Sequence, residues 1–526
     1  MDGAGRVDVS EANDNKPLRG GLMVCGTTSD AGKSHVTSGL CRLLARRGVR
    51  VAPFKAQNMA LNSFVTTEGR EIGRAQAVQA WAAGVEPEVA MNPILLKPTS
   101  DRTSQVVVMG KPIGHLDAAA YHELKPALLA TVLGALEDLR SRFDVVIIEG
   151  AGSPAEINLL DHDIVNLRVA HEAGLSAVIV GDIDRGGVFA ALHGTVTLLP
   201  DHYRRLVGGF VINKFRGDPA LLGEGTAELE RRSGVPTLGV VPFVADVALD
   251  AEDSLALSGP RPRPFPGDND GAAGDRLDIA VIRFPRLSNV TDLDACAIEP
   301  GVDVRLVDAA AGLGCPDLVV LPGTKATVAD LAWLRERGLD VAIETSGALV
   351  LGICGGYQMM GRHIVDEVES ELGKVEGLGW LDVETEFRSE KVTRRCEGTV
   401  MGERSHGYEI HHGVVTRGPG AHAWVHLDAG TYGLDTGPGS EPEEEGAIDA
   451  AQARFMGTSV HGLFEGDRLR ATFLIEIARR ADKCFIPRGV SFQGARNRQL
   501  DRLADVLGEH LDLDAIDALI ARGAPQ

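Results

Sequence analysis

The chain has 526 residues, a hydrophobic content of 44% and a formal net charge of −21. At about 100–200 residues per domain, this length predicts two or three domains with ordinary buried cores. The negative charge argues against nucleic acid or an anionic membrane as the main partner. No apolar run approaches the roughly 20 residues needed to span a bilayer, so we expect a cytoplasmic protein.

The N-terminal residues and the cysteines also favour a cytoplasmic protein. The first residues are polar and lack the apolar segment of a secretory signal, and we expect residues 1–19 to form a flexible tail. Seven cysteines are scattered along the chain without a CxxC pair, which favours reduced thiols. No His/Cys cluster has the spacing of a transition-metal site.

Residues 20–257 alternate short apolar runs with helix-length stretches. This alternation predicts an α/β domain with a mostly parallel sheet covered on both faces. A helix is expected over 33–47, where apolar residues recur at helical spacing. The expected strands are 21–25, 49–54, 145–148, 177–180, 210–212 and 238–241.

A second α/β series follows a break in the pattern. Residues 258–276 are rich in Pro, Gly and Asp and are interpreted as an interdomain linker. The second domain is expected over 277–526, with an exposed loop near 434–446 and terminal helices within 498–522. Its expected strands are 279–282, 318–321 and 348–353.

A phosphate-binding motif lies between the first strand and the first helix. Residues 26–34 read GTTSDAGKS, and a Gly-rich loop that opens a helix directs backbone N–H groups at phosphates. Lys33 adds a positive charge, and Ser34 offers a hydroxyl to Mg²⁺. The spacing is one residue longer than the strict pattern, and a turn that binds nothing is the weaker alternative. The predicted ATP-binding residues are Gly26, Thr27, Thr28, Gly32, Lys33 and Ser34.

Two further strand ends belong with this site. Glu149 follows an apolar strand and is predicted to hold Mg²⁺, because ligands of open α/β sheets bind at the carboxyl ends of the strands. The alternative for Glu149 is a capping or salt-bridged carboxylate. Asn213 follows another strand and is predicted to read the base edge, with a simple turn residue as its alternative.

The second domain contains a cysteine in a nucleophile elbow. Residues 349–361 read LVLGICGGYQMMG, in which a strand runs into Cys354 and glycines permit a sharp turn. The following helix favours the thiolate of Cys354. We predict an oxyanion hole from the N–H groups of Gly355 and Gly323, the latter after the strand 318–321. The alternative for Cys354 is a small buried core residue.

A cysteine nucleophile needs a base, and His461 is the predicted one. It follows a short β-like run and precedes a glycine. The competing histidines are His406, His411 and His412, whose segment is expected either to line the cleft or to form a hairpin.

The two sites and several other segments together resemble the cobyric acid synthase family. The first domain resembles the dethiobiotin synthetase group, and the elbow with His461 resembles a class I glutamine amidotransferase. That class usually has Glu two residues after the histidine; here the residue is Leu463, and the nearest acid is Glu465, so a third triad member stays open. The segments that carry the resemblance are 26–34, 54–64, 92–98, 149–158, 161–166, 181–189 and 349–361.

The resemblance implies a reaction and further residues. The family amidates four peripheral carboxylates (b, d, e and g) of adenosylcobyrinic acid a,c-diamide, consuming one ATP and one glutamine for each amide. An acyl phosphate and an internal path for ammonia are expected. Residues in the shared segments are candidates for contacts with phosphate or corrin carboxylates, with loop hydrogen bonding as the alternative. They are Lys55, Asn58, Asn62, Lys97, Asp182, Asp184 and Arg185.

Three rival interpretations remain. The a,c-diamide synthase of the same pathway shares both domain types. A P-loop switch protein with a degenerate amidotransferase domain belongs to another class, but Thr28 stands where such switches carry an extra signature lysine. A free-standing glutaminase that feeds another subunit would not need the ATP site. The sequence leaves the oligomeric state, the order of amidation and the preference for cobalt-bearing or metal-free corrin open.

Overall fold

The computed structural model describes residues 18–100, 102–244, 247, 274–429 and 442–525. Most of the expected tail, the linker segment 258–273 and the loop segment 434–441 lie outside the described residues. Within the described part of the chain, no helix has both the length and the apolar character needed to cross a membrane.

The first domain is built on a parallel sheet with strand order β12-β11-β10-β1-β9-β2. Each strand corresponds to an apolar run that the sequence predicted; β2 begins two residues later than expected, and the other five strands are longer than expected by up to three residues at either end. The strands are β1 (Gly20–Gly26), β2 (Val51–Phe54), β9 (Val145–Glu149), β10 (Ser176–Asp182), β11 (Val207–Phe215) and β12 (Thr237–Pro242). All are parallel, so their carboxyl ends lie at one edge of the sheet.

Both faces of this sheet are covered by helices, because alternate residues of each strand point to opposite faces. In β1, Met23 and Cys25 pack into one core while Leu22 and Val24 pack into the other. The first face carries α3 (Ala118–Arg142), α4 (Leu167–Glu172), α5 (Val188–Leu198), α6 (Asp201–Arg204) and α7 (Gly225–Ser233). The second face carries α1 (Lys33–Arg46) and part of α2 (Arg74–Ala83).

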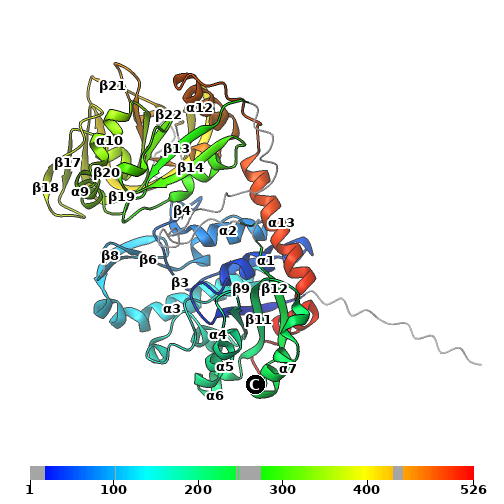
Figure 1. Cartoon of the computed structure of the whole chain (residues 1–526). Helices are drawn as coiled ribbons and strands as arrows, with labels where there is room; N and C mark the ends of the chain where they lie inside the picture. The colour runs from blue at the N-terminus through cyan, green and yellow to red at the C-terminus, as the bar shows by residue number, and fades with distance from the viewer. Residues whose placement is uncertain (1–17, 101, 245–246, 248–273, 430–441, 526) are drawn as a thin grey trace, which may run out of the picture.

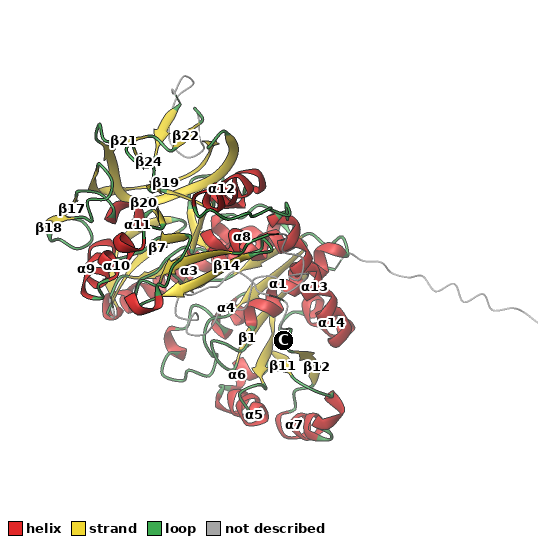
Figure 2. Ribbon diagram, turned by 45° about the horizontal axis from the view of Figure 1, so that its top comes forward, coloured by secondary structure: helices red, strands yellow, loops and turns green. Residues whose placement is uncertain are grey.

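The last two helices pack on the first domain, although the sequence assigned 277–526 to the second. α13 (Phe492–His510) and α14 (Leu513–Arg522) complete the second face, where Leu507 packs against Gly39. Arg42 also pairs with Asp501 at 2.8 Å. Figure 2 shows α1, α13 and α14 together on one side of β1 and β11. Helical periodicity located these helices, but their partner depends on which apolar surface is left uncovered.

Two small sheets of the first domain face the second domain (Figure 1). One has the order β3-β6-β7-β8, and the other pairs β4 with β5. They interrupt the α/β alternation between β2 and α3. Their strands are β3 (Gln57–Met59), β4 (Ser63–Val65), β5 (Glu71–Gly73), β6 (Ile94–Pro98), β7 (Thr103–Val108) and β8 (Lys111–Asp117).

The second domain contains a sheet with the order β14-β13-β15-β16-β25-β24-β21. The first five strands in this order, β14, β13, β15, β16 and β25, pair in parallel. The last two, β24 and β21, continue the sheet in antiparallel pairing. The strands are β13 (Leu277–Ile282), β14 (Val302–Val307), β15 (Leu318–Leu321), β16 (Leu349–Ile353), β21 (Ala421–His422), β24 (Ala447–Asp449) and β25 (Phe455–Thr458). The helices are α8 (Asp294–Ala297), α9 (Thr327–Glu336), α10 (Leu339–Ser346), α11 (Gly355–Met359) and α12 (Asp467–Arg480).

A second sheet in this domain is built around a long antiparallel hairpin that the sequence did not predict as such. β19 (Val383–Val400) and β20 (Glu403–Arg417) pair along their lengths, with a register shift between Phe387 and Val392. The histidine segment 405–412 therefore lies in a hairpin, as one of its two alternatives proposed. The other strands are β17 (His363–Asp366), β18 (Gly373–Glu376), β22 (Val425–Leu427), β23 (Glu443–Glu445) and β26 (Val460–His461).

Candidate functional site

The phosphate motif forms the loop between β1 and α1, at the carboxyl edge of the first sheet. Gly32 stands immediately before α1 with φ of 95°, a conformation that favours glycine. A Cβ there would lie 2.1 Å from Nδ2 of Asn213. Lys33 is buried, and its Nζ donates to the carbonyls of Thr28 at 2.9 Å and Gly152 at 3.2 Å. The loop is thus curled around the ammonium group that a phosphate would meet.

Ser34 and Glu149 lie together beside this loop. The Ser34 hydroxyl donates to Oε1 of Glu149 at 3.0 Å, and Lys55 Nζ lies 2.9 Å from the same oxygen. Gln79 donates to the other carboxylate oxygen. Burial by itself would raise the pKa of Glu149, but Lys55, Gln79 and the charge of Lys33 hold it below its ordinary value. A hydroxyl and an ionised carboxylate in contact fit the oxygen ligands that Mg²⁺ prefers.

The other predicted residues of this edge are engaged with one another. Asn213 Nδ2 donates to the carbonyl of Ala31 at 3.0 Å and so supports the phosphate loop. Asp182 pairs with Lys214 at 2.8 Å, and the N–H of Asp184 donates to Asp182 at 2.9 Å. Arg185 pairs with Asp30 of the loop at 2.9 Å, with its side chain largely exposed. These contacts place the segment 182–185 against the phosphate loop.

The elbow joins β16 to α11 at Cys354. Cys354 has φ of 50° and ψ of −111°, a strained conformation for a residue other than glycine. The turn needs small neighbours: a Cβ on Gly356 would lie 1.9 Å from the carbonyl oxygen of Leu321. A Cβ on Gly323 would lie 3.0 Å from Cε1 of His461. Gly323 and Gly355 thus lie on the two loops that meet at Cys354, where the predicted oxyanion donors were placed.

His461 lies beside Cys354 and is held by a carboxylate from a distant segment. Its Nδ1 is 2.7 Å from Oδ2 of Asp292, in the short helix η6 (Val290–Leu293). Burial alone would lower the pKa of His461, but the charges of Asp292 and Cys354 raise it to about 10. Burial alone would raise the pKa of Cys354, but His461 lowers it. The arrangement favours a thiolate beside an imidazolium.

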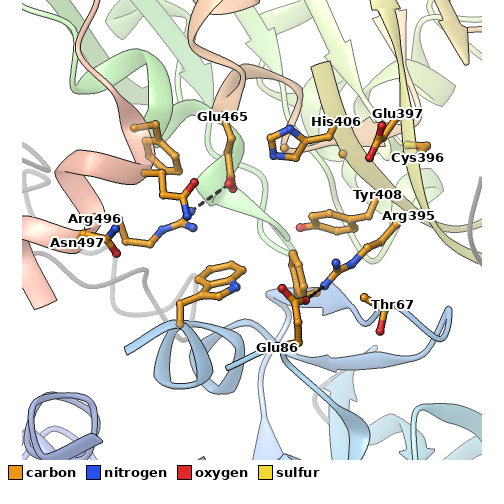
Figure 3. Close-up of a pocket in the computed structure, with 16 residues that line it drawn as sticks. Thr67, Glu86, Arg395, Cys396, Glu397, His406, Tyr408, Glu465, Arg496 and Asn497 are labelled. Carbon is orange, nitrogen blue, oxygen red and sulfur yellow. Dashed lines mark hydrogen bonds and ion pairs between the residues drawn. The ribbon is translucent and has the colours of Figure 1, made fainter. Parts of the chain in front are cut away.

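Glu465, the acid closest to His461 in sequence, is held by two arginines. It contacts Arg74 at 2.7 Å and Arg496 at 3.1 Å, and these arginines lower its pKa to about 2. Figure 3 shows Glu465 and Arg496 at the wall of a cavity of about 420 Å³ between the domains. Tyr408 also lines that cavity and stacks on His461, with ring centroids 5.4 Å apart.

The competing histidines occupy different positions. His406 lines the large cavity of Figure 3 and not the cavity at Cys354. His411 and His412 line the cavity at Cys354, where His411 contacts Glu409 at 3.4 Å. His412 Nδ1 lies 3.0 Å from the carbonyl of Arg388.

The cavity at Cys354 reaches the first domain. It has a volume of about 40 Å³ and is lined by Lys97 of β6 as well as by second-domain residues that include Lys391. Glu71 of β5 contacts Lys97 and Lys391, each at 2.6 Å, and all three side chains are at most 5% exposed. Lys97 was predicted to contact phosphate or corrin carboxylates, and the structure places it at the wall of the cavity at Cys354.

The remaining candidates lie inside the first domain. Asn58 is buried, and its amide donates to Gln76 at 2.9 Å. Asn62 is buried next to Ser63, whose N–H donates to Asn289 of the second domain at 2.9 Å. The Tyr408 hydroxyl donates to the Ser63 carbonyl at 3.0 Å. Asn289 lines the cavity at Cys354 and Tyr408 stacks on His461, so the domains are joined at that site.

Asp292, Glu71 and Lys391 are the residues that sequence reasoning missed. None lies in a recognisable motif, and each is more than 150 residues from at least one partner, so no local pattern pointed to them. The Glu71–Lys391 contact and the Asp292–His461 contact arise only when separate segments fold together.

The chain was compared with known proteins. Residues 22–256 match the family described as CobQ/CobB/MinD/ParA nucleotide binding domain, and residues 278–469 match the CobB/CobQ-like glutamine amidotransferase domain. Cobyric acid synthase of Nocardia farcinica is 51% identical, covering 97% of this chain and 98% of that protein. Cobyric acid synthase of Saccharopolyspora erythraea is 53% identical (96% and 95%), and that of Streptomyces coelicolor is 50% identical (97% and 98%). With half of its residues identical over nearly the whole length, the chain belongs to the cobyric acid synthase family of ATP-dependent glutamine amidotransferases.

Proposed function

We propose that this enzyme converts the b, d, e and g carboxylates of adenosylcobyrinic acid a,c-diamide to amides, in the cytoplasm, using one ATP and one glutamine each time. The observation that carries the proposal is the union of two sites in one chain. A phosphate loop with Lys33 lies in the first domain, and Cys354 with His461 lies where the second domain meets the first.

The glutamine half-reaction follows from the charge state of the cysteine site. The Cys354 thiolate attacks the side-chain carbonyl carbon of glutamine, and the N–H of Gly355 is placed to stabilise the oxyanion. The His461 imidazolium donates a proton to the leaving nitrogen, which departs as ammonia. Water then gives a proton to His461 and attacks the thioester, which releases glutamate and restores the thiolate and the imidazolium.

The ATP half-reaction requires a carboxylate to become an acyl donor. A substrate carboxylate oxygen attacks the γ-phosphorus of ATP, ADP leaves, and an acyl phosphate forms. Lys33 stabilises the phosphoryl charge during this transfer. Ser34 and Glu149 would hold Mg²⁺, which when bound neutralises charge on the β- and γ-phosphates. Ammonia then attacks the acyl carbon, phosphate departs, and the amide is formed.

The test combines a substrate assay with a cysteine variant. Purified protein is incubated with ATP, Mg²⁺, glutamine and adenosylated cobyrinic acid a,c-diamide, and the product mass is followed. Four successive amidations are expected; Cys354→Ala should lose them with glutamine and regain them with ammonium. In a parallel reaction that supplies cobyrinic acid, amidation at positions a and c would support the sister synthase. ATP hydrolysis without any change in corrin mass would refute the corrin substrate.

A further inference from the structure

The carboxylate that contacts His461 comes from a part of the chain with no catalytic signature. Asp292 lies on η6, between β13 and α8, 169 residues before the histidine. Its Oδ2 is 2.7 Å from Nδ1 of His461, and the N–H of Gly462 donates to its Oδ1 at 2.9 Å. The side chains of Asp292 and His461 are nearly inaccessible to solvent, at 3% and 1% exposed respectively. Both carboxylate oxygens are therefore used to hold the histidine and the residue that follows it.

This geometry determines which imidazole nitrogen is available for chemistry. A carboxylate at Nδ1 accepts a hydrogen bond, so the proton resides on Nδ1 in the neutral ring. Nε2 is buried and makes no hydrogen bond with the described residues within ordinary limits, although the imidazole and the Cys354 thiol interact. Nε2 is therefore the nitrogen that exchanges a proton with Cys354 and with the departing ammonia.

A second histidine–carboxylate pair lies near Cys354 and must be weighed against the first. His411 Nε2 is 3.4 Å from Oε1 of Glu409, a longer contact than the 2.7 Å of the Asp292 pair. Glu409 is also bound by Arg394. His411 lowers the pKa of Cys354 only through its charge, whereas His461 lowers it both through its charge and through a direct interaction with the thiol. The shorter contact and the direct thiol interaction favour His461 with Asp292.

We propose that Asp292 is the positioning carboxylate of the glutaminase site, which holds His461 in the tautomer and orientation that serve Cys354. This inference rests on the glutaminase half of the proposed function. It completes a Cys–His–Asp triad whose acid is contributed from η6, and it removes Glu465 from that role. Asp292 acts through His461 and touches neither the thiol nor the amide being cleaved.

The same turn connects the triad to the first domain. Asn289, at the start of η6, has φ of 50°, and its side-chain oxygen accepts from the N–H of Ser63 at 2.9 Å. Three residues later the chain reaches Asp292. The carboxylate is thus positioned on a turn that is hydrogen-bonded to the ATP-binding domain.

The decisive variant is Asp292→Asn, which preserves shape but changes hydrogen bonding. The single amide oxygen would accept from Gly462, so the amide NH₂ would face Nδ1 of His461 and donate to it. The ring proton would then reside on Nε2, which could no longer accept the proton of Cys354. We expect glutamate release to fall by about 10²–10⁴-fold, the range for loss of a correctly placed general base.

Thiol alkylation as a function of pH gives a readout that a purely structural role would not change. Iodoacetamide reacts with the thiolate, and its rate at Cys354 measures the thiol pKa without corrin or ATP. Cys354→Ala supplies the background from the other cysteines. The groups that face this pair from the surrounding elements are Lys97, Lys325, Glu369, Lys391, Glu409, His411, His412 and Glu445. None is altered in Asp292→Asn, so a shift to higher pH reports the loss of the Asp292–His461 interaction.

The controls separate this proposal from its alternatives. Glu465→Gln and Glu409→Gln remove the two rival acids and should leave the alkylation profile of Cys354 nearly unchanged. Asp292→Glu keeps a carboxylate and should recover part of the glutaminase activity. Ammonium-dependent amidation should persist in Asp292→Asn, which shows that the ATP site is intact.

Two results would overturn the proposal. One is an Asp292→Asn enzyme whose glutamate release and alkylation profile stay within about threefold of wild type. The other is a larger shift in Glu409→Gln or Glu465→Gln than in Asp292→Asn. If Asp292→Asn fails to fold, the comparison of Asp292→Glu with wild type decides by the same alkylation profile. A failed corrin assignment would leave this profile unchanged, so the two failures are distinguishable.

Discussion

Replacing Glu71 with glutamine would leave two buried ammonium groups, those of Lys97 and Lys391, without the carboxylate that contacts both. Lys391 belongs to the second domain, so this contact crosses the domain interface. Removing one partner of a buried pair costs about 3–5 kcal/mol, because the remaining charge is left uncompensated. For domains of this size, about 2–4 °C of melting temperature accompanies each kcal/mol, so we expect a loss of roughly 6–20 °C.

The pH dependence of that loss checks its electrostatic origin. Burial lowers the pKa of Lys391 from 10.5 to about 8 in the wild type, although Glu71 opposes the shift. Without Glu71 the pKa of Lys391 should fall further, so this lysine becomes neutral at a lower pH in the folded variant. An amine whose pKa is lower in the folded than in the unfolded state destabilises the fold while it is protonated. The deficit of Glu71→Gln should therefore shrink as pH rises toward 8, and then stay constant.

Calorimetric melting of the full chain between pH 5 and pH 9 measures this effect. Throughout that range the Glu71 carboxylate of the wild type stays ionised, because the two lysines hold its pKa below the ordinary value of 4.5. Adding Lys391→Met to Glu71→Gln removes one of the unpaired charges and should restore part of the stability. A Glu71→Gln protein that melts within about 4 °C of wild type at all pH values would refute the reasoning.

Three other predictions concern the two sites separately. Lys33→Ala should lower ATP-dependent amidation by at least about 10²-fold while leaving glutamate release intact, as measured by ADP and glutamate in the same reaction. Equal loss of both would show that Lys33 acts through folding. Gly356→Ala places a Cβ 1.9 Å from the carbonyl oxygen of Leu321. Glutamine-dependent amidation should therefore be lost and ammonium-dependent amidation retained. A variant that still uses glutamine as well as wild type would contradict the steric argument. In wild type, kcat/KM for glutamine should reach its plateau at a pH below the ordinary thiol pKa of 9.0, because the pKa of Cys354 is lowered. It should decline near pH 10, where His461 loses its proton. A plateau that begins only above pH 9 would refute the ion pair of Cys354 and His461.

Features that depend on one short segment were predicted from the sequence, whereas features that depend on contacts between distant segments were not. The phosphate loop and the cysteine elbow were located because each is a contiguous strand–loop–helix segment whose glycines are required by local backbone geometry. The strand at 318–321 was predicted with the bounds that β15 has in the structure. A hairpin was only one of two alternatives for segment 405–412, and the extent and register of the β19–β20 pairing were not predicted, because they depend on the surrounding sheet.

The terminal helices and Lys97 show the limit of local reasoning. Periodicity identified the helical segment 498–522, but its apolar stripe covers the sheet of the first domain, far away in sequence. Lys97 lies in a segment shared with the family, yet it reaches the cavity of Cys354, because β6 faces the second domain. A residue type and its neighbours along the chain do not specify which distant surface it meets.

The sequence by itself determined the domain types and the two chemistries, and it predicted Cys354 as the nucleophile, because these depend on short segments and on resemblance along the whole chain. Only the tertiary structure decided that Asp292 contacts His461 and that Glu465 pairs with arginines instead. It also decided that Ser63 and Glu71 join the ATP-binding domain to the glutaminase site. The physical reason is that hydrogen bonds and ion pairs require contact in space, and contacts between segments hundreds of residues apart leave no periodic pattern in the chain.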